Sequence, residues 1–139
     1  MSLRCQNIKF DNMRKIITYL LAMLGLTTAC GQKNYEDMDV AEFATLIADT
    51  NVVVLDVRTA SEYAEGHLDS AVNIDVKEGD FLQKAKATLP TDRTIAVYCR
   101  SGRRSANACG QLSAEGFRVV NLKGGIMAWT GQNRPVVKE

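Results

Sequence analysis

Two apolar runs stand out in the pattern of hydrophobic and polar positions along the chain. Residues 52–55 read Val-Val-Val-Leu and residues 95–98 read Ile-Ala-Val-Tyr, with no charged position in either run. Strands that are apolar on both faces belong inside a sheet that helices cover on both sides. The pattern therefore predicts two interior strands, with residues 52–55 in a central position. Partly apolar runs at residues 71–74 and 117–122 predict two more strands.

Helical patterns separate these runs. Residues 39–42 (Asp-Val-Ala-Glu) and residues 59–62 (Thr-Ala-Ser-Glu) have the capping-box sequence that starts a helix. Residues 80–89 predict a third helix, and residues 106–116 predict a fourth that ends at a glycine. Because strands alternate with helices, the expected fold class is α/β, an open parallel sheet of about five strands with helices on both faces.

The composition places these elements in one domain. The chain has 139 residues, of which 46% are apolar, a size that suits a single hydrophobic core. Its net charge is +1, but the first 29 residues hold four basic residues and one acidic residue, which leaves 13 basic and 15 acidic residues for the rest. A slightly acidic body has no general affinity for nucleic acid, and none is expected as a partner.

The N-terminal part of the chain has the layout of a targeting segment. Residues 1–12 show no pattern and are interpreted as a leader or as vector-derived. Residues 13–29 follow the order of a signal peptide, because Arg14 and Lys15 precede an apolar stretch and three small residues precede Cys30.

This order resembles a bacterial lipoprotein signal, which implies lipidation of Cys30. The resemblance also implies a tether at residues 30–34 and a mature domain at residues 35–139, held at the periplasmic side of the cell envelope by a lipid anchor in the membrane. The sequence departs from the pattern at Thr27, where such signals usually have leucine. The alternative is an amphipathic or buried helix with a surface cysteine, in a cytoplasmic protein.

The candidate chemistry lies where the run at residues 95–98 ends. Cys99 follows directly, and a short segment with three arginines, residues 100–105, leads into the predicted helix. Backbone N–H groups at the start of a helix have no partner within it, and the helix dipole favours an anion there. A cysteine in this field is expected to have a lowered thiol pKa and to act as a thiolate nucleophile at neutral pH.

Residues 99–105 resemble the active-site loop of rhodaneses, in which a strand-end cysteine starts the pattern Cys-Arg-x-Gly-x-Arg-Ser. Residues 55–75 are similar to a second rhodanese signature, and residues 124–129, with a glycine pair and a tryptophan, are similar to a third. The similarity spans about residues 35–136. It implies a rhodanese-like fold and a sulfurtransferase that moves a sulfane sulfur through a persulfide on Cys99.

The resemblance and the expected electrostatic field assign roles around this nucleophile. Substrate contacts are expected from Arg100, Ser101, Gly102, Arg103, Arg104 and Ser105. Asp56 and Arg58, at the end of a neighbouring strand, are expected to support the loop through an ion pair or a turn cap. The implied donor is a small anion such as thiosulfate, and the implied acceptor is cyanide or a thiol. No metal or organic cofactor is required, and a single histidine without a Cys-x-x-Cys pair argues against zinc.

Other functions stay open at this point. A phosphatase or arsenate reductase of the same fold has five residues between its cysteine and an arginine, whereas Ser105 occupies the sixth position after Cys99. A non-catalytic rhodanese-like binding module would be expected to lose the cysteine or the arginines. A dithiol oxidoreductase would have to pair Cys99 with Cys109, ten residues further along, although Cys109 and His67 are both expected to be structural.

Overall fold

The computed structural model describes residues 33–139, which form five strands and five helices. The predicted leader, the signal peptide and Cys30 lie outside these residues, and of the predicted tether only residues 33 and 34 are described. The strands are β1 (Glu36–Met38), β2 (Val53–Asp56), β3 (Val72–Asn73), β4 (Thr94–Tyr98) and β5 (Arg118–Leu122). The helices are α3 (Val40–Ile47), α4 (Ala60–Glu65), α5 (Phe81–Thr88), α6 (Arg103–Ala114) and α7 (Gly125–Gly131).

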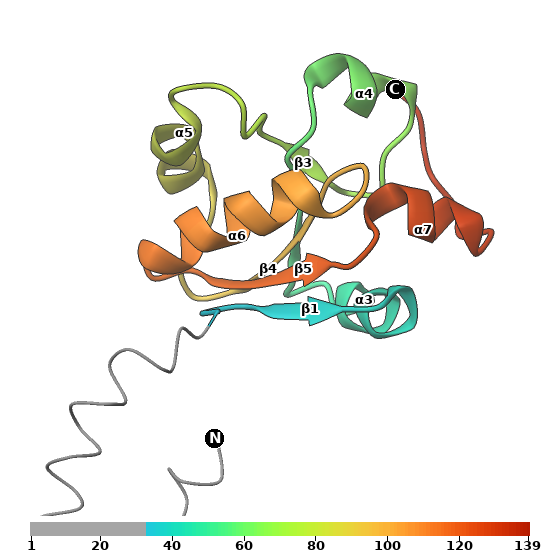
Figure 1. The fold of residues 1–139 in the computed structure, drawn as a ribbon, viewed down its shortest axis with the longest axis horizontal. Coiled ribbons are helices and arrows are strands. Elements are labelled where there is room, and N and C mark those ends of the chain that lie inside the picture. Colours follow the sequence, from blue (N-terminus) through green and yellow to red (C-terminus); the bar gives the residue numbers. More distant parts are fainter. Residues whose placement is uncertain (1–32) are drawn as a thin grey trace, which may run out of the picture. The chain divides into compact units, whose positions relative to one another are not determined.

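Every pair of neighbouring strands is parallel, and the strand order is β1-β5-β4-β2-β3 (Figure 1). The predicted α/β fold with an open parallel sheet is confirmed. The run at residues 52–55, predicted as a central strand, forms β2, which lies inside the sheet one place from the middle. The middle strand is β4, because β5 and β1 both add to its far side.

Two elements lack a recognisable signal in the sequence. β1 is three residues long and begins with two acidic residues, so it shows neither apolar alternation nor β-branched side chains. It forms because residues 36–38 pair in register with residues 120–122 along the edge of β5. α7 begins at a glycine pair, although glycine is more typical of the end of a helix than of its start.

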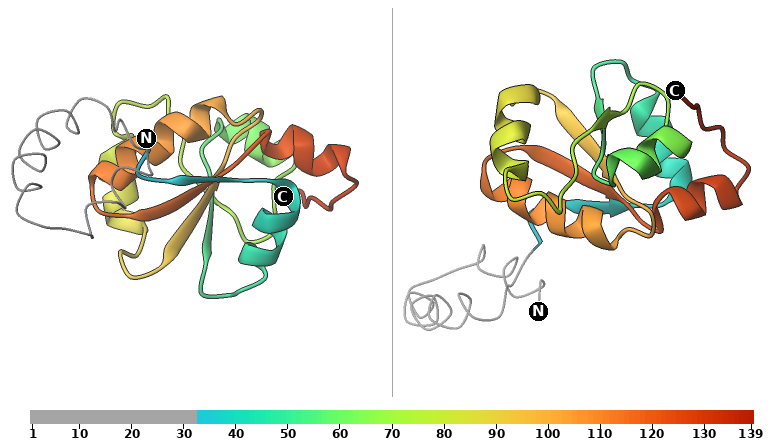
Figure 2. Two further views of the ribbon diagram at one scale, coloured as in Figure 1. Left: turned by 60° about the horizontal axis from the view of Figure 1, so that its bottom comes forward. Right: turned by 90° about the horizontal axis from the view of Figure 1, so that it is seen from above.

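Helices cover both faces of the sheet (Figure 2), and the side chains at the end of β4 belong alternately to the two cores beneath them. Ile95, Val97 and Cys99 belong to the core that α5 and α6 cover, whereas Ala96 and Tyr98 belong to the core that α3 and α7 cover. All five residues are completely buried. Burial on both faces agrees with the apolar run in the sequence, and it fixes the position of Cys99.

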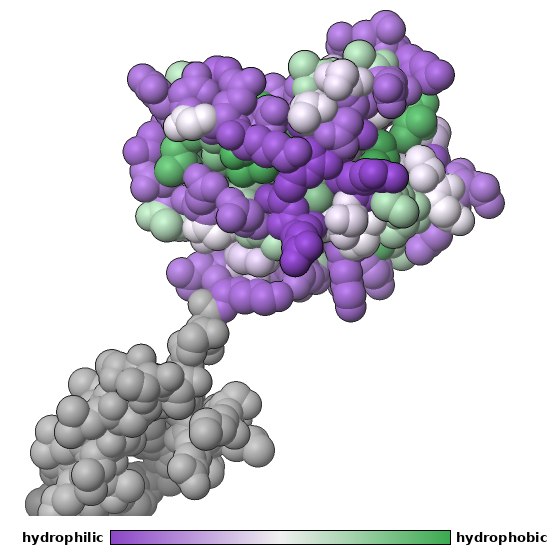
Figure 3. All heavy atoms as spheres, turned by 45° about the horizontal axis from the view of Figure 1, so that its top comes forward, coloured by the Kyte–Doolittle hydropathy of each residue, from purple (hydrophilic) through white to green (hydrophobic). Residues whose placement is uncertain are grey.

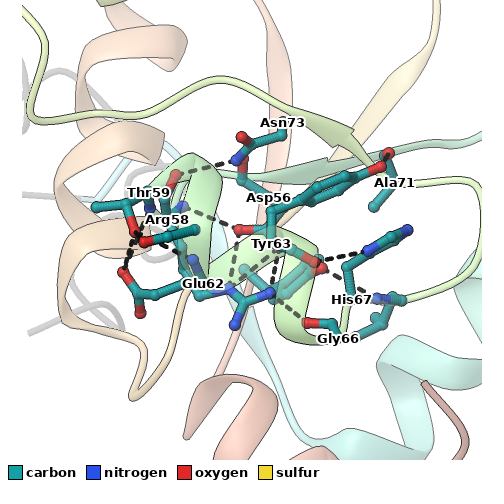
Figure 4. A network of polar contacts seen from close by, with 12 residues as sticks. Asp56, Arg58, Thr59, Glu62, Tyr63, Gly66, His67, Ala71 and Asn73 are labelled. Atoms are coloured by element: carbon teal, nitrogen blue, oxygen red, sulfur yellow. Dashed lines mark hydrogen bonds and ion pairs between the residues drawn. The ribbon is translucent and has the colours of Figure 1, made fainter. Parts of the chain in front are cut away.

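A buried polar network ties the end of β2 to β4. Asp56 is completely buried and accepts hydrogen bonds from Arg58 (Nη2–Oδ2, 2.6 Å) and from the Tyr98 hydroxyl (2.6 Å). Arg58 also donates to the Gly66 carbonyl oxygen at 2.8 Å (Figure 4), and the Tyr98 oxygen accepts the Leu68 N–H at 3.0 Å. The segment that contains α4 is therefore attached to the sheet by charge-assisted hydrogen bonds.

The helices of the domain are short, and two of them start at the predicted capping boxes. In α3 the Asp39 side chain accepts the Glu42 N–H, and in α4 the Thr59 side chain accepts the Glu62 N–H. The glutamate side chain reaches back to the cap N–H in both cases. Within residues 33–139, no helix combines the length and the apolar character that crossing a membrane requires.

Tyr98→Phe is expected to lower the free energy of unfolding by about 1–3 kcal/mol, because the Asp56 carboxylate and the Leu68 N–H both lose a buried partner. Urea denaturation followed by circular dichroism measures this loss. Tyr35→Phe is the control, since it removes the same hydroxyl from a half-buried tyrosine outside the network. Equal stability of Tyr98→Phe and the wild type would show that the network does not hold the strands together.

Candidate active site

Cys99 lies at the carboxyl end of β4, in the turn that leads into α6. The Gly102 N–H donates a hydrogen bond to the Cys99 sulfur at 3.1 Å, and the Ser105 hydroxyl donates another at 3.3 Å. Ser105 belongs to the first turn of α6 and is completely buried. The sulfur thus meets donors from both the loop and the helix, an arrangement that favours a negative charge on it.

These donors set the protonation of the Cys99 thiol. Burial is the largest single influence and opposes the charged form, because the residue is completely excluded from water. Hydrogen bonds from the Ser105 hydroxyl and from the N–H groups of Ser105, Gly102 and Ser101 outweigh burial, so the pKa of the Cys99 thiol is lowered from its ordinary value. Because the sulfur is buried, a substrate reaches it only after neighbouring groups move.

Helix α7 orients the loop by binding its carbonyl groups. The Ile126 N–H donates to the Cys99 carbonyl oxygen at 2.9 Å, and the Met127 N–H donates to the Arg100 carbonyl oxygen at 3.1 Å. Gly125 makes this approach possible, because a Cβ atom there would lie 2.3 Å from the Arg100 carbonyl oxygen. With these carbonyl groups held by α7, the N–H groups of the same loop are left to face the sulfur.

Gly102 closes the turn in a left-handed conformation, with a φ of +99°. Its carbonyl oxygen lies 3.5 Å from the side-chain nitrogen Nδ2 of Asn121, which also donates to the Asp37 carboxylate of β1 at 3.0 Å. The contributions of Asn121 and Gly125 to the loop are not predicted from the sequence. The available signals were a lone asparagine inside the apolar run of β5 and the glycine pair at residues 124–125.

The three arginines of the loop have different surroundings. Arg104 donates two hydrogen bonds to Glu62 of α4, Nη1–Oε1 at 2.8 Å and Nη2–Oε2 at 2.9 Å. The bond from Arg104 is the main reason why the pKa of the Glu62 carboxyl falls from 4.5 to about 2. Arg100 and Arg103 are exposed, and neither forms an ion pair with another residue of the 33–139 range. A band of strongly hydrophilic side chains crosses the face that α4, α5 and α6 line (Figure 3).

The other candidate residues do not contact the sulfur. Asp56 and Arg58 bind each other beside the end of β4. His67 is buried, its Nδ1 lies 2.8 Å from the Tyr63 carbonyl oxygen, and its ring stacks on the Tyr63 ring (Figure 4). Burial raises the pKa of the Cys109 thiol to about 12. In the part of the chain that the structure describes, no group of His, Cys, Asp and Glu side chains is placed to hold a metal ion.

Comparison with known proteins identifies the family. The family model of the rhodanese-like domain matches residues 39–132. The protein YtwF of Bacillus subtilis is 39% identical over 104 residues, which cover 70% of this chain and 98% of that protein. The chain is also 36% identical over 103 residues to "Sulfurtransferase" of Allochromatium vinosum, with 73% of this chain and 94% of that protein covered.

A third relative, "Thiosulfate sulfurtransferase 18" of Arabidopsis thaliana, is 35% identical over 114 residues, which cover 73% of this chain and 83% of that protein. Among solved structures, a rhodanese-related protein from Thermoplasma volcanium matches with a TM-score of 0.67 and 34% identity, covering 76% of this chain and 100% of that chain. The fold, the position of the cysteine and these matches agree. The chain therefore belongs to the rhodanese-like domain family.

The pH dependence of alkylation tests the hydrogen bonds to the sulfur. Iodoacetamide is expected to modify Cys99 at a lower pH than an ordinary cysteine, because the thiol pKa is lowered. Ser105→Ala removes one donor to the thiolate, and the rate at pH 7 is expected to fall by about tenfold, as the loss of a hydrogen bond to a charged group implies. Ser113→Ala, on the same helix but bonded to the Gly110 carbonyl oxygen, should leave the rate unchanged. Equal rates for the two variants would contradict the role of Ser105.

Proposed function

We propose that this protein is a rhodanese-type sulfurtransferase that carries a sulfane sulfur as a persulfide on Cys99. The Cys99 thiolate attacks the outer sulfur of a donor such as thiosulfate, the sulfur–sulfur bond of the donor breaks, and sulfite leaves with the bonding electron pair. Cyanide or a thiolate then attacks the terminal sulfur of the persulfide and regenerates the Cys99 thiolate. The cycle is balanced without an external oxidant or reductant, and it requires no metal or organic cofactor.

The observation that carries this proposal is the set of donors around the sulfur. The Gly102 N–H and the Ser105 hydroxyl stabilise the thiolate that attacks, and the same groups can bind the terminal sulfur of an anionic persulfide. Two of the relatives are named as sulfurtransferases, one of them for thiosulfate. The exposed guanidinium groups of Arg100 and Arg103 favour the approach of an anionic donor.

The geometry favours sulfur transfer over the alternatives. In a phosphatase or arsenate reductase loop the sixth residue after the cysteine is an arginine, whereas here it is Ser105, which donates to the sulfur itself. A binding module without chemistry has no need for a thiol whose pKa is lowered, as that of Cys99 is. A dithiol oxidoreductase would need Cys109 as a second thiolate, but burial raises the pKa of that thiol to about 12.

Intact-mass spectrometry after incubation with thiosulfate tests the proposed persulfide. The wild type is expected to gain one sulfur atom and to lose it again when cyanide is added. Cys99→Ser should gain none, because among residues 33–139 the other cysteine, Cys109, has a thiol whose pKa burial raises to about 12. Cys109→Ser should behave as the wild type. Absence of the adduct on the wild type, or its presence on Cys99→Ser, would end the proposal.

For the residues outside the structure we propose a lipid anchor at Cys30, at the periplasmic side of a bacterial cell envelope. The support is the order of basic, apolar and small residues in front of this cysteine. Expression in a bacterial host is then expected to give a membrane-associated product, which Cys30→Ser moves to the soluble fraction. Cys5→Ser is the matched control, because Cys5 precedes the signal pattern. Recovery of the wild type in the soluble fraction would contradict the anchor.

A further inference from the structure

The ion pair between Arg104 and Glu62 links the candidate loop to a distant part of the chain. The two residues are 42 positions apart, and both side chains are partly buried, with 22% of Arg104 and 28% of Glu62 exposed. Two hydrogen bonds, one from each terminal nitrogen to a different carboxylate oxygen, fix a guanidinium group in direction as well as in position. An exposed arginine without such a partner would instead sample many rotamers in water.

Glu62 is itself held in place by the start of α4. Its Oε1 accepts the Thr59 N–H at 3.3 Å and the Thr59 hydroxyl at 3.1 Å, which completes the capping box (Figure 4). Arg58, which precedes the cap residue Thr59, donates to Asp56 and to the Gly66 carbonyl oxygen, and these two residues come before and after α4 in the chain. Glu62 is therefore a rigid acceptor, and the direction in which Arg104 points is set by α4 rather than by the loop.

Arg104 lies in the first turn of α6, directly before Ser105, whose hydroxyl donates to the Cys99 sulfur at 3.3 Å. In agreement with this placement, the charge of the Cys99 thiolate is among the causes that raise the pKa of Arg104, after the hydrogen bond and the charge of Glu62. The pairing with Glu62 uses two of the five N–H donors of the guanidinium, one on each terminal nitrogen, which leaves Nε–H and one hydrogen on each terminal nitrogen for a further acceptor.

We propose that Glu62 is a positioning residue for anion binding at Cys99, which holds the Arg104 guanidinium where it attracts a negatively charged donor. The identity of the anion as a sulfur donor rests on the proposed sulfurtransferase function. The placement of Arg104 by Glu62 does not depend on that function. The carboxylate partly offsets the charge of Arg104, so the two effects of Glu62 have opposite signs. Positioning is the larger effect, and loss of Glu62 therefore weakens the attraction of anions to the site.

The test compares the alkylation of Cys99 by iodoacetate, which is anionic, with alkylation by iodoacetamide, which is neutral. Both reagents react with the same thiolate, so the ratio of their rates cancels any change in thiol pKa and reports the local field. Arg104→Ala is expected to lower this ratio by about threefold or more. Glu62→Gln should lower it to a similar value, although glutamine still suits the capping box of α4. In an Arg104→Ala background, Glu62→Gln should no longer lower the ratio, because only the negative charge of the carboxylate is then lost.

Glu42→Gln is the matched control, because it makes the same change at the equivalent position of the capping box in α3, where the residue caps Asp39 and not the active-site loop. It should leave the ratio at the wild-type value. A ratio that rises in Glu62→Gln would show that Glu62 only screens Arg104, and an unchanged ratio would show that Arg104 keeps its position without Glu62. Either result overturns the proposal.

Steady-state kinetics with thiosulfate and cyanide separate this inference from the proposed function. Glu62→Gln is expected to raise the KM for thiosulfate about as much as Arg104→Ala does, with a smaller change in kcat, because the lost interaction binds the donor. A wild type that does not turn over thiosulfate would count against the proposed function, and the alkylation ratios would still decide whether Glu62 positions Arg104. If Glu62→Gln and Arg104→Ala lowered kcat equally and left the KM for thiosulfate unchanged, the role of the pair in donor binding would be contradicted.

Discussion

The structure depends on one constraint, the need to supply hydrogen-bond donors to a sulfur atom that is completely buried. A buried thiolate without partners is unstable, since burial opposes the charged form. The turn after β4 meets this need by directing the Gly102 N–H and the Ser105 hydroxyl at the sulfur. Backbone N–H and carbonyl groups alternate along a chain, so the turn can point N–H groups inward only if other groups donate to its outward-facing carbonyl oxygens.

The surrounding elements hold the turn in the conformation that this constraint requires. α7 donates to the carbonyl oxygens of Cys99 and Arg100, and only a glycine at position 125 allows the two backbones to come so close. Burial of β4 on both faces prevents the end of the strand from shifting, while the Asp56 network ties the neighbouring strand to it. The backbone of the loop is thus held in place around the Cys99 sulfur, whereas the side chains of Arg100 and Arg103 lie at the surface of the same loop.

The fold and the position of Cys99 could be predicted because their signals are local in the sequence. The apolar run at residues 95–98 identified a buried strand, the two capping boxes identified the starts of α3 and α4, and the order strand, polar loop, helix placed Cys99 at a helix N-terminus. The ion pair of Arg104 with Glu62 joins positions 42 residues apart, and β1 forms only because β5 offers it an edge. Such features depend on tertiary contacts, which one sequence does not display. The sequence therefore predicts Arg104 only as a substrate contact and not as the partner of Glu62.

The most direct test of this account is an NMR titration that follows the amide proton of Gly102 and the state of the Cys99 thiol in the same sample. If the Gly102 N–H donates to the thiolate, its resonance moves as the thiol ionises, with the same midpoint, and this midpoint lies below that of an ordinary cysteine. Cys99→Ala should remove the movement. A Gly102 resonance that does not respond to the ionisation of Cys99, or a midpoint at or above the ordinary value, would contradict the account.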